Sequence, residues 1–136
     1  MSPTGSPRRK GLLTGFLVNR AFTNPRMGLS AHLEGVMNGT FLAVLGAVWG
    51  ELRLPARAAT AAFWLALYGT YVNWGSTLLA AVFGTSRGTP IAGAGYAAAP
   101  WQENLVTSGF LSVAVAITLC CIFLLWGLRG RAAAQP

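Results

Sequence analysis

Three apolar runs limit what this chain can fold into. They cover residues 28–49, 56–83 and 105–127, and each is long enough to cross a bilayer as a helix, because about 20 residues at a rise of about 1.5 Å span the hydrocarbon core. Hydrophobic residues make up 54% of the chain and charged residues 10%, a balance that excludes an ordinary soluble globular protein. The sequence therefore predicts an all-α integral membrane protein.

A shorter apolar run at residues 11–23 follows a basic tail at residues 1–10. If this run forms a fourth helix, both chain ends lie on the same side of the membrane, with seven of the ten Lys and Arg on that side and three on the other. If only three helices cross the membrane, the two sides carry six and four. Lys and Arg of short loops stay on the cytoplasmic side, so the sequence favours one transmembrane four-helix domain over residues 11–129. We expect a multi-pass protein of a bacterial inner membrane, with both termini, including the tail at 130–136, in the cytoplasm.

The helix expected at 28–49 begins with ionisable residues that are costly in lipid. Its small residues repeat at every fourth position and form what we call the small-residue ridge: Ala31, Gly35, Gly39, Ala43 and Ala47. Such ridges let helices approach closely in a membrane, and Leu33 and Met37 on the opposite face are expected to meet lipid. At about 100° per residue, His32 and Glu34 lie on different sides of the ridge, with Asn38 one turn beyond Glu34. His32 and Glu34 are therefore expected to meet different neighbours, either other helices or a second copy of the chain.

Polar and aromatic residues recur in the helices expected at 56–83 and 105–127. Tyr71, Asn73 and Trp74 lie past the middle of the first helix, and Gln102 and Glu103 stand just before the second. In the four-helix topology these positions share one half of the membrane with the start of the helix at 28–49. The sequence therefore predicts a single pocket of ionisable, amide and aromatic side chains on the non-cytoplasmic side.

The residue types in this pocket suit proton transfer better than other chemistries, because carboxyl and imidazole groups are common general acids and bases. The sequence contains no phosphate-binding glycine loop, no Ser/His/Asp arrangement and no CxxC or HExxH motif. His32 is the only histidine, so a haem held by two histidines would need two copies of the chain. A metal ion stays open, with His32 and Glu34 as candidate ligands, although a separation of two residues on a helix is unfavourable for shared ligation.

Three blocks of the sequence carry a resemblance to a known family. They are NPRMGLSAHLEGVMNG at 24–39, YGTYVNW at 68–74 and QEN at 102–104. Over residues 11–129 the chain resembles the hydroxylaminobenzene mutases, small integral membrane isomerases of nitroaromatic degradation. The run at 11–23 is shorter than the first hydrophobic helix usual in that family.

The resemblance implies an isomerase that converts hydroxylaminobenzene-type arylhydroxylamines into 2-aminophenols. The hydroxyl group moves from nitrogen to the ortho carbon of the ring without net redox change, so the net reaction requires no cofactor. Breaking the N–O bond needs an acid, an anion near the developing positive charge and aromatic walls. We expect His32, Glu34 and Glu103 to supply the acid and the anion.

A second set of residues is expected to bind the substrate by stacking on its ring or by holding the departing oxygen close enough to recombine. These are Asn38, Tyr71, Asn73, Trp74 and Gln102. The expected partners are a small aromatic substrate and the lipid bilayer, and the cations, which flank the apolar runs instead of forming a soluble basic face, exclude nucleic acid.

Two functions of other classes stay open. The chain is alternatively a non-catalytic membrane subunit that docks into a larger complex through the small-residue ridge, or a small transporter that moves its ligand without changing it. Four short helices enclose little volume, so a site or a transport path is expected to need more than one copy. We therefore expect a homo-oligomer.

Overall fold

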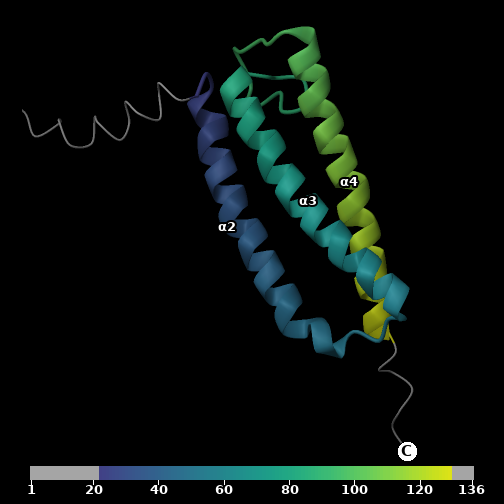
Figure 1. Cartoon of the computed structure of the whole chain (residues 1–136). Helices are drawn as coiled ribbons and strands as arrows, with labels where there is room; N and C mark the ends of the chain where they lie inside the picture. The colour runs from purple at the N-terminus through teal and green to yellow at the C-terminus, as the bar shows by residue number, and fades with distance from the viewer. Residues whose placement is uncertain (1–21, 130–136) are drawn as a thin grey trace, which may run out of the picture.

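The computed structural model describes residues 22–129, which form three long helices and one short 3-10 helix (Figure 1). The long helices are α2 (Pro25–Val48), α3 (Ala56–Phe83) and α4 (Pro100–Leu128), and η1 (Trp49–Glu51) follows α2. This part of the chain contains no strand, which confirms the all-helical prediction. The helix expected at 11–23 lies outside the described residues except for its last two positions, as do the tails at 1–10 and 130–136, so the count of four helices stays a prediction.

Local sequence explains where α2 and α4 begin. Asn24 caps α2, because its side-chain Oδ1 accepts hydrogen bonds from the backbone N–H groups of Arg26 at 3.1 Å and Met27 at 3.4 Å. Proline follows at the first helical position of both helices, where its missing N–H costs nothing. α2 therefore starts three residues before the expected range, and α4 starts at Pro100 instead of residue 105, which places Gln102 and Glu103 inside its first turn.

Two of the helices have the length and apolar composition of membrane spans. They are α2 together with η1, and α4. This is consistent with the membrane protein that the sequence predicts. α3 is as long, at 28 residues, but it lies between α2 and α4 and packs against both (Figure 1). A helix with neighbours on two sides can carry more polar residues, because those residues find partners there.

The closest packing in the described part joins α3 to α4 through small residues. Ala62, Ala66 and Gly69 of α3 are buried in this contact, and a Cβ atom added to Gly69 would collide with Ile117 of α4. The thiol of Cys120 donates to the carbonyl of Ala62 at 3.5 Å. The small-residue stripe that brings two helices together is thus on α3, whereas the sequence predicted one on the helix at 28–49.

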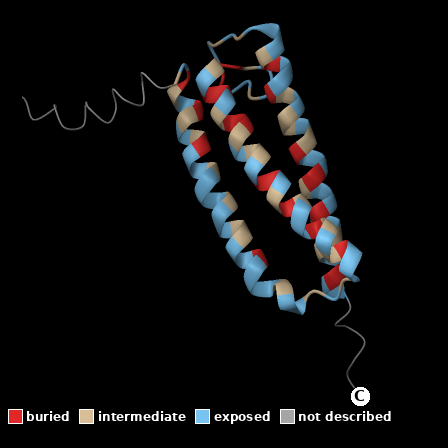
Figure 2. Cartoon of the chain, in the orientation of Figure 1, coloured by how far each residue is buried: buried red, intermediate tan, exposed pale blue. Residues whose placement is uncertain are grey.

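The small-residue ridge of α2 is mostly uncovered within residues 22–129. Ala31 is buried and Gly35 faces Trp74, but a Cβ atom added to Gly39 would meet nothing within 4 Å. Most of α2 is exposed, as Figure 2 shows. Leu33 and Met37, which were expected to face lipid, are among its exposed residues. The close helix approach predicted for the ridge therefore occurs only at its first two positions in the described part.

The loop at residues 84–99 is tied to the first turns of α2 and α4. The side chain of Asn24 donates from Nδ2 to the carbonyl of Ala92 at 2.8 Å, and the Arg26 guanidinium donates to the carbonyl of Ala94 at 2.5 Å. The same guanidinium lies over the Tyr96 ring, 5.7 Å from its centre. At the opposite end of the bundle, the backbone N–H of Arg53 donates to the carbonyl of Gly127 at 3.1 Å.

Candidate active site

The Glu34 carboxyl group is held between α2 and α3. Its Oε2 atom accepts a hydrogen bond from Nδ2 of Asn73 at 3.1 Å and one from the hydroxyl of Thr77 at 2.6 Å. Asn73 and Thr77 lie one turn apart on α3, so both face the same point of α2. A carboxyl group in an apolar helix is costly without such partners. The structure therefore fixes the position of Glu34 and leaves its Oε1 atom without a partner among the described residues.

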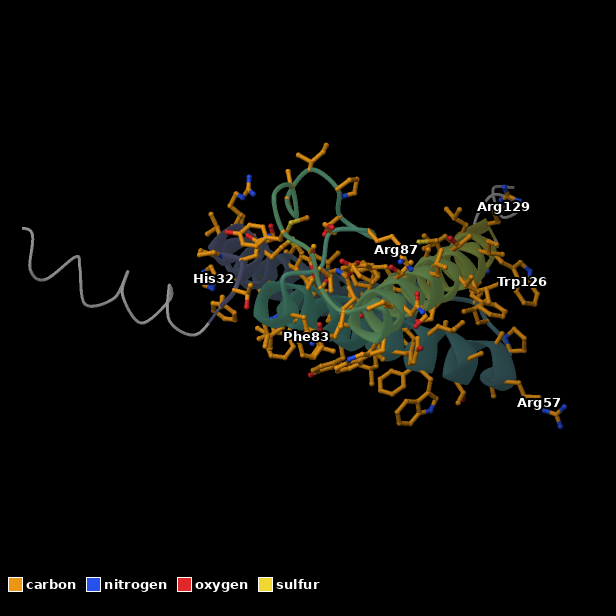
Figure 3. All side chains as sticks on the ribbon, turned by 90° about the horizontal axis from the view of Figure 1, so that it is seen from above. His32, Arg57, Phe83, Arg87, Trp126 and Arg129 are labelled. Atoms are coloured by element: carbon orange, nitrogen blue, oxygen red, sulfur yellow. The ribbon has the colours of Figure 1, made fainter. Side chains whose placement is uncertain are left out.

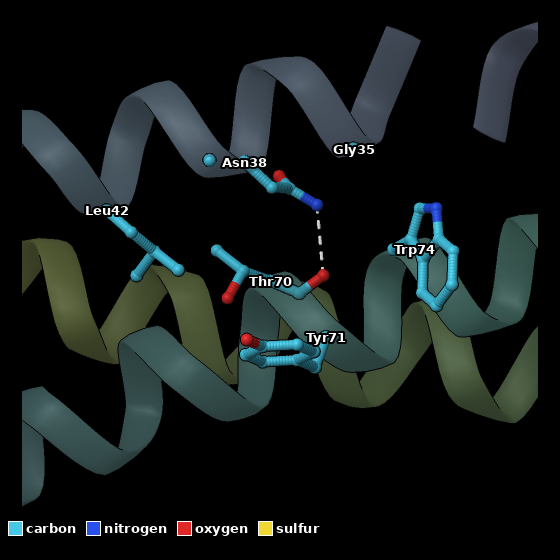
Figure 4. A pocket seen from close by; sticks show the side chains of 7 residues that line it. Gly35, Asn38, Leu42, Thr70, Tyr71 and Trp74 are labelled. Carbon is cyan, nitrogen blue, oxygen red and sulfur yellow. Dashed lines mark hydrogen bonds between the residues drawn. The ribbon is translucent and has the colours of Figure 1, made fainter. Parts of the chain in front are cut away.

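A groove lies between α2 and α3, and Gly35, the residue after Glu34, is one of the residues that line it. It has a volume of about 250 Å³ and is mainly apolar, and seven residues line it (Figure 4): Gly35, Asn38, Gly39, Leu42, Thr70, Tyr71 and Trp74. Nδ2 of Asn38 donates to the backbone carbonyl of Thr70 at 2.9 Å, across the groove. We call this space the aromatic groove, because Tyr71 and Trp74 supply two aromatic side chains to it.

Gly35 allows Trp74 to approach α2. A Cβ atom added at Gly35 would lie 3.5 Å from Nε1 of Trp74, which is already van der Waals contact. Larger side chains at this position would push the indole away from the backbone. Three of the five predicted substrate-binding residues, Asn38, Tyr71 and Trp74, thus line one groove. A fourth, Asn73, holds Glu34, whose neighbour Gly35 lines the same groove.

His32 does not join this cluster. Its side chain is exposed on the outer side of the bundle, as Figure 3 shows, and it makes no hydrogen bond within residues 22–129. Its separation from Glu34 agrees with the expected angle between them on the helix. Glu34 meets a helix of its own chain, whereas His32 meets none of the described helices.

Glu103 and Gln102 contact the loop at the end of the bundle. The buried Glu103 carboxylate accepts hydrogen bonds from the backbone N–H groups of Ser86 and Arg87, both at 3.0 Å. Oε1 of Gln102 accepts a hydrogen bond from the backbone N–H of Ala99 at 2.9 Å, which closes the first turn of α4. Neither side chain lines the aromatic groove or bonds to Glu34, so the structure divides the predicted pocket into two clusters.

The described residues show no group of three or more His, Cys, Asp and Glu side chains that could hold a metal ion. The two candidate ligands, His32 and Glu34, point in different directions on α2. A metal bound by both of them is not supported within this part of the chain.

The similarities to known proteins cover nearly all of the described structure. The family model for styrene oxide isomerase matches residues 10–129. The chain belongs to the styrene oxide isomerase family. Hydroxylaminobenzene mutase HabB of Ectopseudomonas oleovorans is 48% identical over 124 residues, which are 90% of this chain and 75% of that relative. Hydroxylaminobenzene mutase HabA of the same organism is 41% identical over 119 residues, 87% of each chain. No solved structure matches.

These relatives confirm the resemblance to the hydroxylaminobenzene mutases and the prediction of an isomerase. The family match also runs through residues 10–21, which lie outside the described residues. As a member of a membrane-associated isomerase family with two apolar helices of spanning length, the chain is consistent with a membrane protein.

Sequence reasoning missed several residues that shape the site of this isomerase. Thr77 donates to Glu34, and Gly35, Leu42 and Thr70 line the aromatic groove. A signal for Thr77 was present, because it follows Asn73 by four residues and must share its helix face. Leu42 and Thr70 carried no comparable signal, since apolar and hydroxyl side chains at helical spacing usually serve packing.

Proposed function

We propose that this chain is a multi-pass inner-membrane isomerase that converts hydroxylaminobenzene-type arylhydroxylamines into 2-aminophenols. The observation that carries the proposal is the Glu34 carboxyl group, held by Asn73 and Thr77 beside a groove that Tyr71 and Trp74 line. The names of two relatives with 48% and 41% identity supply the substrate class.

In the proposed reaction, Glu34 gives a proton to the hydroxyl oxygen of the substrate. The N–O bond then breaks heterolytically, and the oxygen leaves as water while positive charge spreads over nitrogen and ring. Water adds to the ortho carbon, which then carries one proton too many on oxygen and one on the ring carbon. One of these two protons returns to the Glu34 carboxylate and the other moves to nitrogen, which gives neutral 2-aminophenol. The enzyme ends as it began, and no electrons are gained or lost overall.

The hydrogen bonds of Glu34 fit a group that changes its charge. The Thr77 hydroxyl has one hydrogen and two acceptors, Oε2 of Glu34 at 2.6 Å and the Asn73 carbonyl at 3.1 Å. It donates to Glu34 when the carboxylate is ionised. When the carboxyl group is protonated, Glu34 donates to Thr77, and Thr77 donates to the Asn73 carbonyl. In both states Oε2 of Glu34 and the hydroxyl of Thr77 keep a hydrogen-bond partner, whose loss would be costly in lipid.

The groove supplies what the cation requires. Tyr71 and Trp74 present aromatic faces, which stabilise a positively charged ring by cation–π contact. We expect the amide of Asn38, which lines the groove, and that of Asn73, which bonds Glu34, to hold the departing water. An apolar surrounding limits competition from bulk water. His32 lies outside this groove, so we assign it to a site completed by another part of the assembly, which we propose to be a homo-oligomer. Glu103 and Gln102 then hold the loop at the bundle end.

A second substrate follows from the family description, which names styrene oxide isomerase. Protonation of an aryl epoxide and cleavage of its C–O bond also place positive charge next to an aromatic ring. The same acid and the same aromatic walls serve both reactions, so styrene oxide belongs in the first assay beside hydroxylaminobenzene.

The test is incubation of the purified protein with hydroxylaminobenzene under anaerobic conditions, without reductant, followed by chromatography. We expect 2-aminophenol from the wild-type protein and a loss of about 100-fold or more in rate for Glu34→Gln, which is the usual scale for a general acid. Glu51→Gln, at the other end of α2, is the matched control and keeps its rate. Parallel samples with a chelator, and an absorption spectrum of the protein, show whether a metal or a haem shared between copies takes part.

Two results would contradict the proposal. A fully active Glu34→Gln variant would show that Glu34 is not the acid, and a fully active His32→Ala variant would show that the reaction does not need His32. Unchanged substrate from a folded wild-type sample would instead favour the docking subunit or the transporter, which proteoliposome flux measurements separate.

A further inference from the structure

A second groove shares Asn38 and Thr70 with the aromatic groove. It has a volume of about 430 Å³, against about 250 Å³ for the aromatic groove, and all three long helices line it. Its lining includes Phe41 of α2, Gly69 and Asn73 of α3, and Ile117 of α4. We call it the three-helix groove.

The two amide side chains in this groove have free acceptors. Asn38 and Asn73 use their Nδ2 atoms to bond the Thr70 carbonyl and Glu34, respectively. Their Oδ1 atoms make no hydrogen bond within residues 22–129. An amide oxygen without a partner is costly in an apolar environment, so the groove suits a ligand that brings N–H or O–H donors. Asn73 also places any such ligand next to Glu34.

The volume and the walls indicate the rest of the ligand. A cavity of about 150 Å³ is enough for benzene, so about 430 Å³ has room for a substituted ring or for two fused rings. Ligand sites in proteins are typically concave and apolar with a few placed polar groups. A lipid acyl chain also fits apolar walls, but it brings no donor to the two amide oxygens.

We propose that the three-helix groove is a second aryl-binding site. It takes the ring of an arylhydroxylamine from the bilayer before the ring passes to the aromatic groove, and it binds the N–H and O–H groups of the ligand through Asn38 and Asn73. This inference rests on the proposed function, because it assumes that substrate class. In this proposal Phe41, Ala114 and Ile117 determine which ring sizes the groove accepts. The aromatic groove, with its smaller volume, does not have this role.

The test uses photolabelling and needs no turnover. The full chain in phosphatidylcholine vesicles is irradiated with trifluoromethyl-phenyldiazirine, a lipid-soluble aryl probe, with and without excess 2-aminophenol, and labelled residues are found by mass spectrometry. We expect 2-aminophenol to suppress labelling of Phe41 and Ile117 and to leave Val115, which is 62% exposed on α4 outside the groove, unchanged. If 2-aminophenol does not reduce labelling of Phe41 and Ile117, as expected for Val115, the groove is filled by lipid and the inference is overturned.

A pair of variants supplies a second readout. Ala114 lines the three-helix groove, and its neighbour Val115 does not. We expect Ala114→Phe to abolish the protection by 2-aminophenol and to lower kcat/KM for a two-ring arylhydroxylamine about tenfold relative to hydroxylaminobenzene, the usual scale for a change in pocket size. Val115→Phe, which introduces the same side chain outside the groove, keeps both the protection and the ratio of kcat/KM values. Equal behaviour of the two variants would contradict the assignment.

The two proposals fail in different ways. A protein that shows protection but does not convert hydroxylaminobenzene contradicts the proposed function and leaves the aryl site standing. A protein that converts it without protection at Phe41 and Ile117 contradicts only the aryl site.

Discussion

The hydroxyl group of Thr77 lies between two acceptors, Oε2 of Glu34 and the backbone carbonyl of Asn73. Replacement by valine keeps the shape and removes the hydrogen bond to Glu34. We expect Thr77→Val to lower kcat about tenfold or more with little change in KM, because a hydrogen bond to a charged group contributes about 1.5–3 kcal/mol. Steady-state kinetics on hydroxylaminobenzene measure this.

Thr60→Val is the matched control for that variant. Thr60 also donates to the carbonyl four residues before it, at 2.9 Å, but it is exposed and lies far from Glu34 along α3. We expect its kinetics to stay at the wild-type level. Equal losses in both variants would mean that the threonine hydroxyls only stabilise α3.

At the scale of single residues, the sequence singled out Glu34 and Asn73, which the structure joins by a hydrogen bond, but it did not single out Thr77. Asn73 stands out because an amide in a long apolar run is expensive. Thr77 does not, because threonine in a helix often bonds its own backbone and needs no other partner. The positions of Glu103 and Gln102 depended on the loop at 84–99, whose backbone path a sequence pattern does not reveal.

At the scale of the helices, α3 and α4 approach closely because Gly69 leaves room for Ile117. We expect Gly69→Ala to lower the free energy of unfolding by about 1–3 kcal/mol, the usual effect of overpacking, since the added Cβ would collide with the Ile117 side chain. Thermal unfolding in detergent measures the change.

Two further variants identify the cause of that loss. Gly75 lies on the same helix, and a Cβ atom added there meets nothing within 4 Å. The unfolding temperature of the Gly75→Ala variant should therefore not fall. Gly69→Ala combined with Ile117→Ala should recover most of the lost stability. A Gly69→Ala variant as stable as the wild type would show that Ile117 moves aside without a loss of folding free energy.

Small residues at every fourth position occur on both α2 and α3, and the sequence alone did not tell which stripe meets a helix of the same chain. Ala58, Ala62 and Ala66 continue to Gly69 on α3 and are buried there, whereas Gly39 and Ala43 on α2 are exposed. Composition predicts that a stripe can pack closely, and only the path of the chain decides what packs on it. Apolar length predicted where the helices run, but Pro25 and Pro100 begin α2 and α4 earlier than the apolar runs indicated.

At the scale of the whole molecule, the two ends of the bundle are joined by different contacts and should face different compartments. In the four-helix topology the loop at 84–99 is outside and η1 is inside. We expect Ile91→Cys, which replaces a residue 89% exposed in that loop, to react with a membrane-impermeant maleimide on intact cells, and Gly50→Cys to react only after permeabilisation. Both are made in a chain with Cys120→Ala and Cys121→Ala.

The opposite labelling pattern would contradict the four-helix topology. Three helices place six of the ten cations on the side of the loop at 84–99, which would then be cytoplasmic. The same experiment therefore tests whether residues 11–23 cross the membrane, a question that charge counting answered only by a small margin.

The contact between Asn24 and Ala92 joins two residues that are 68 positions apart in the chain. During synthesis at about 5–20 residues per second, roughly 3–14 s pass between the appearance of the first and of the second. Throughout that interval Nδ2 of Asn24, at the start of α2, lacks its partner Ala92, although Oδ1 can already cap the helix. The timing of translation thus orders the assembly: α2 forms early, and its open end closes only after α3 and the loop behind it have emerged.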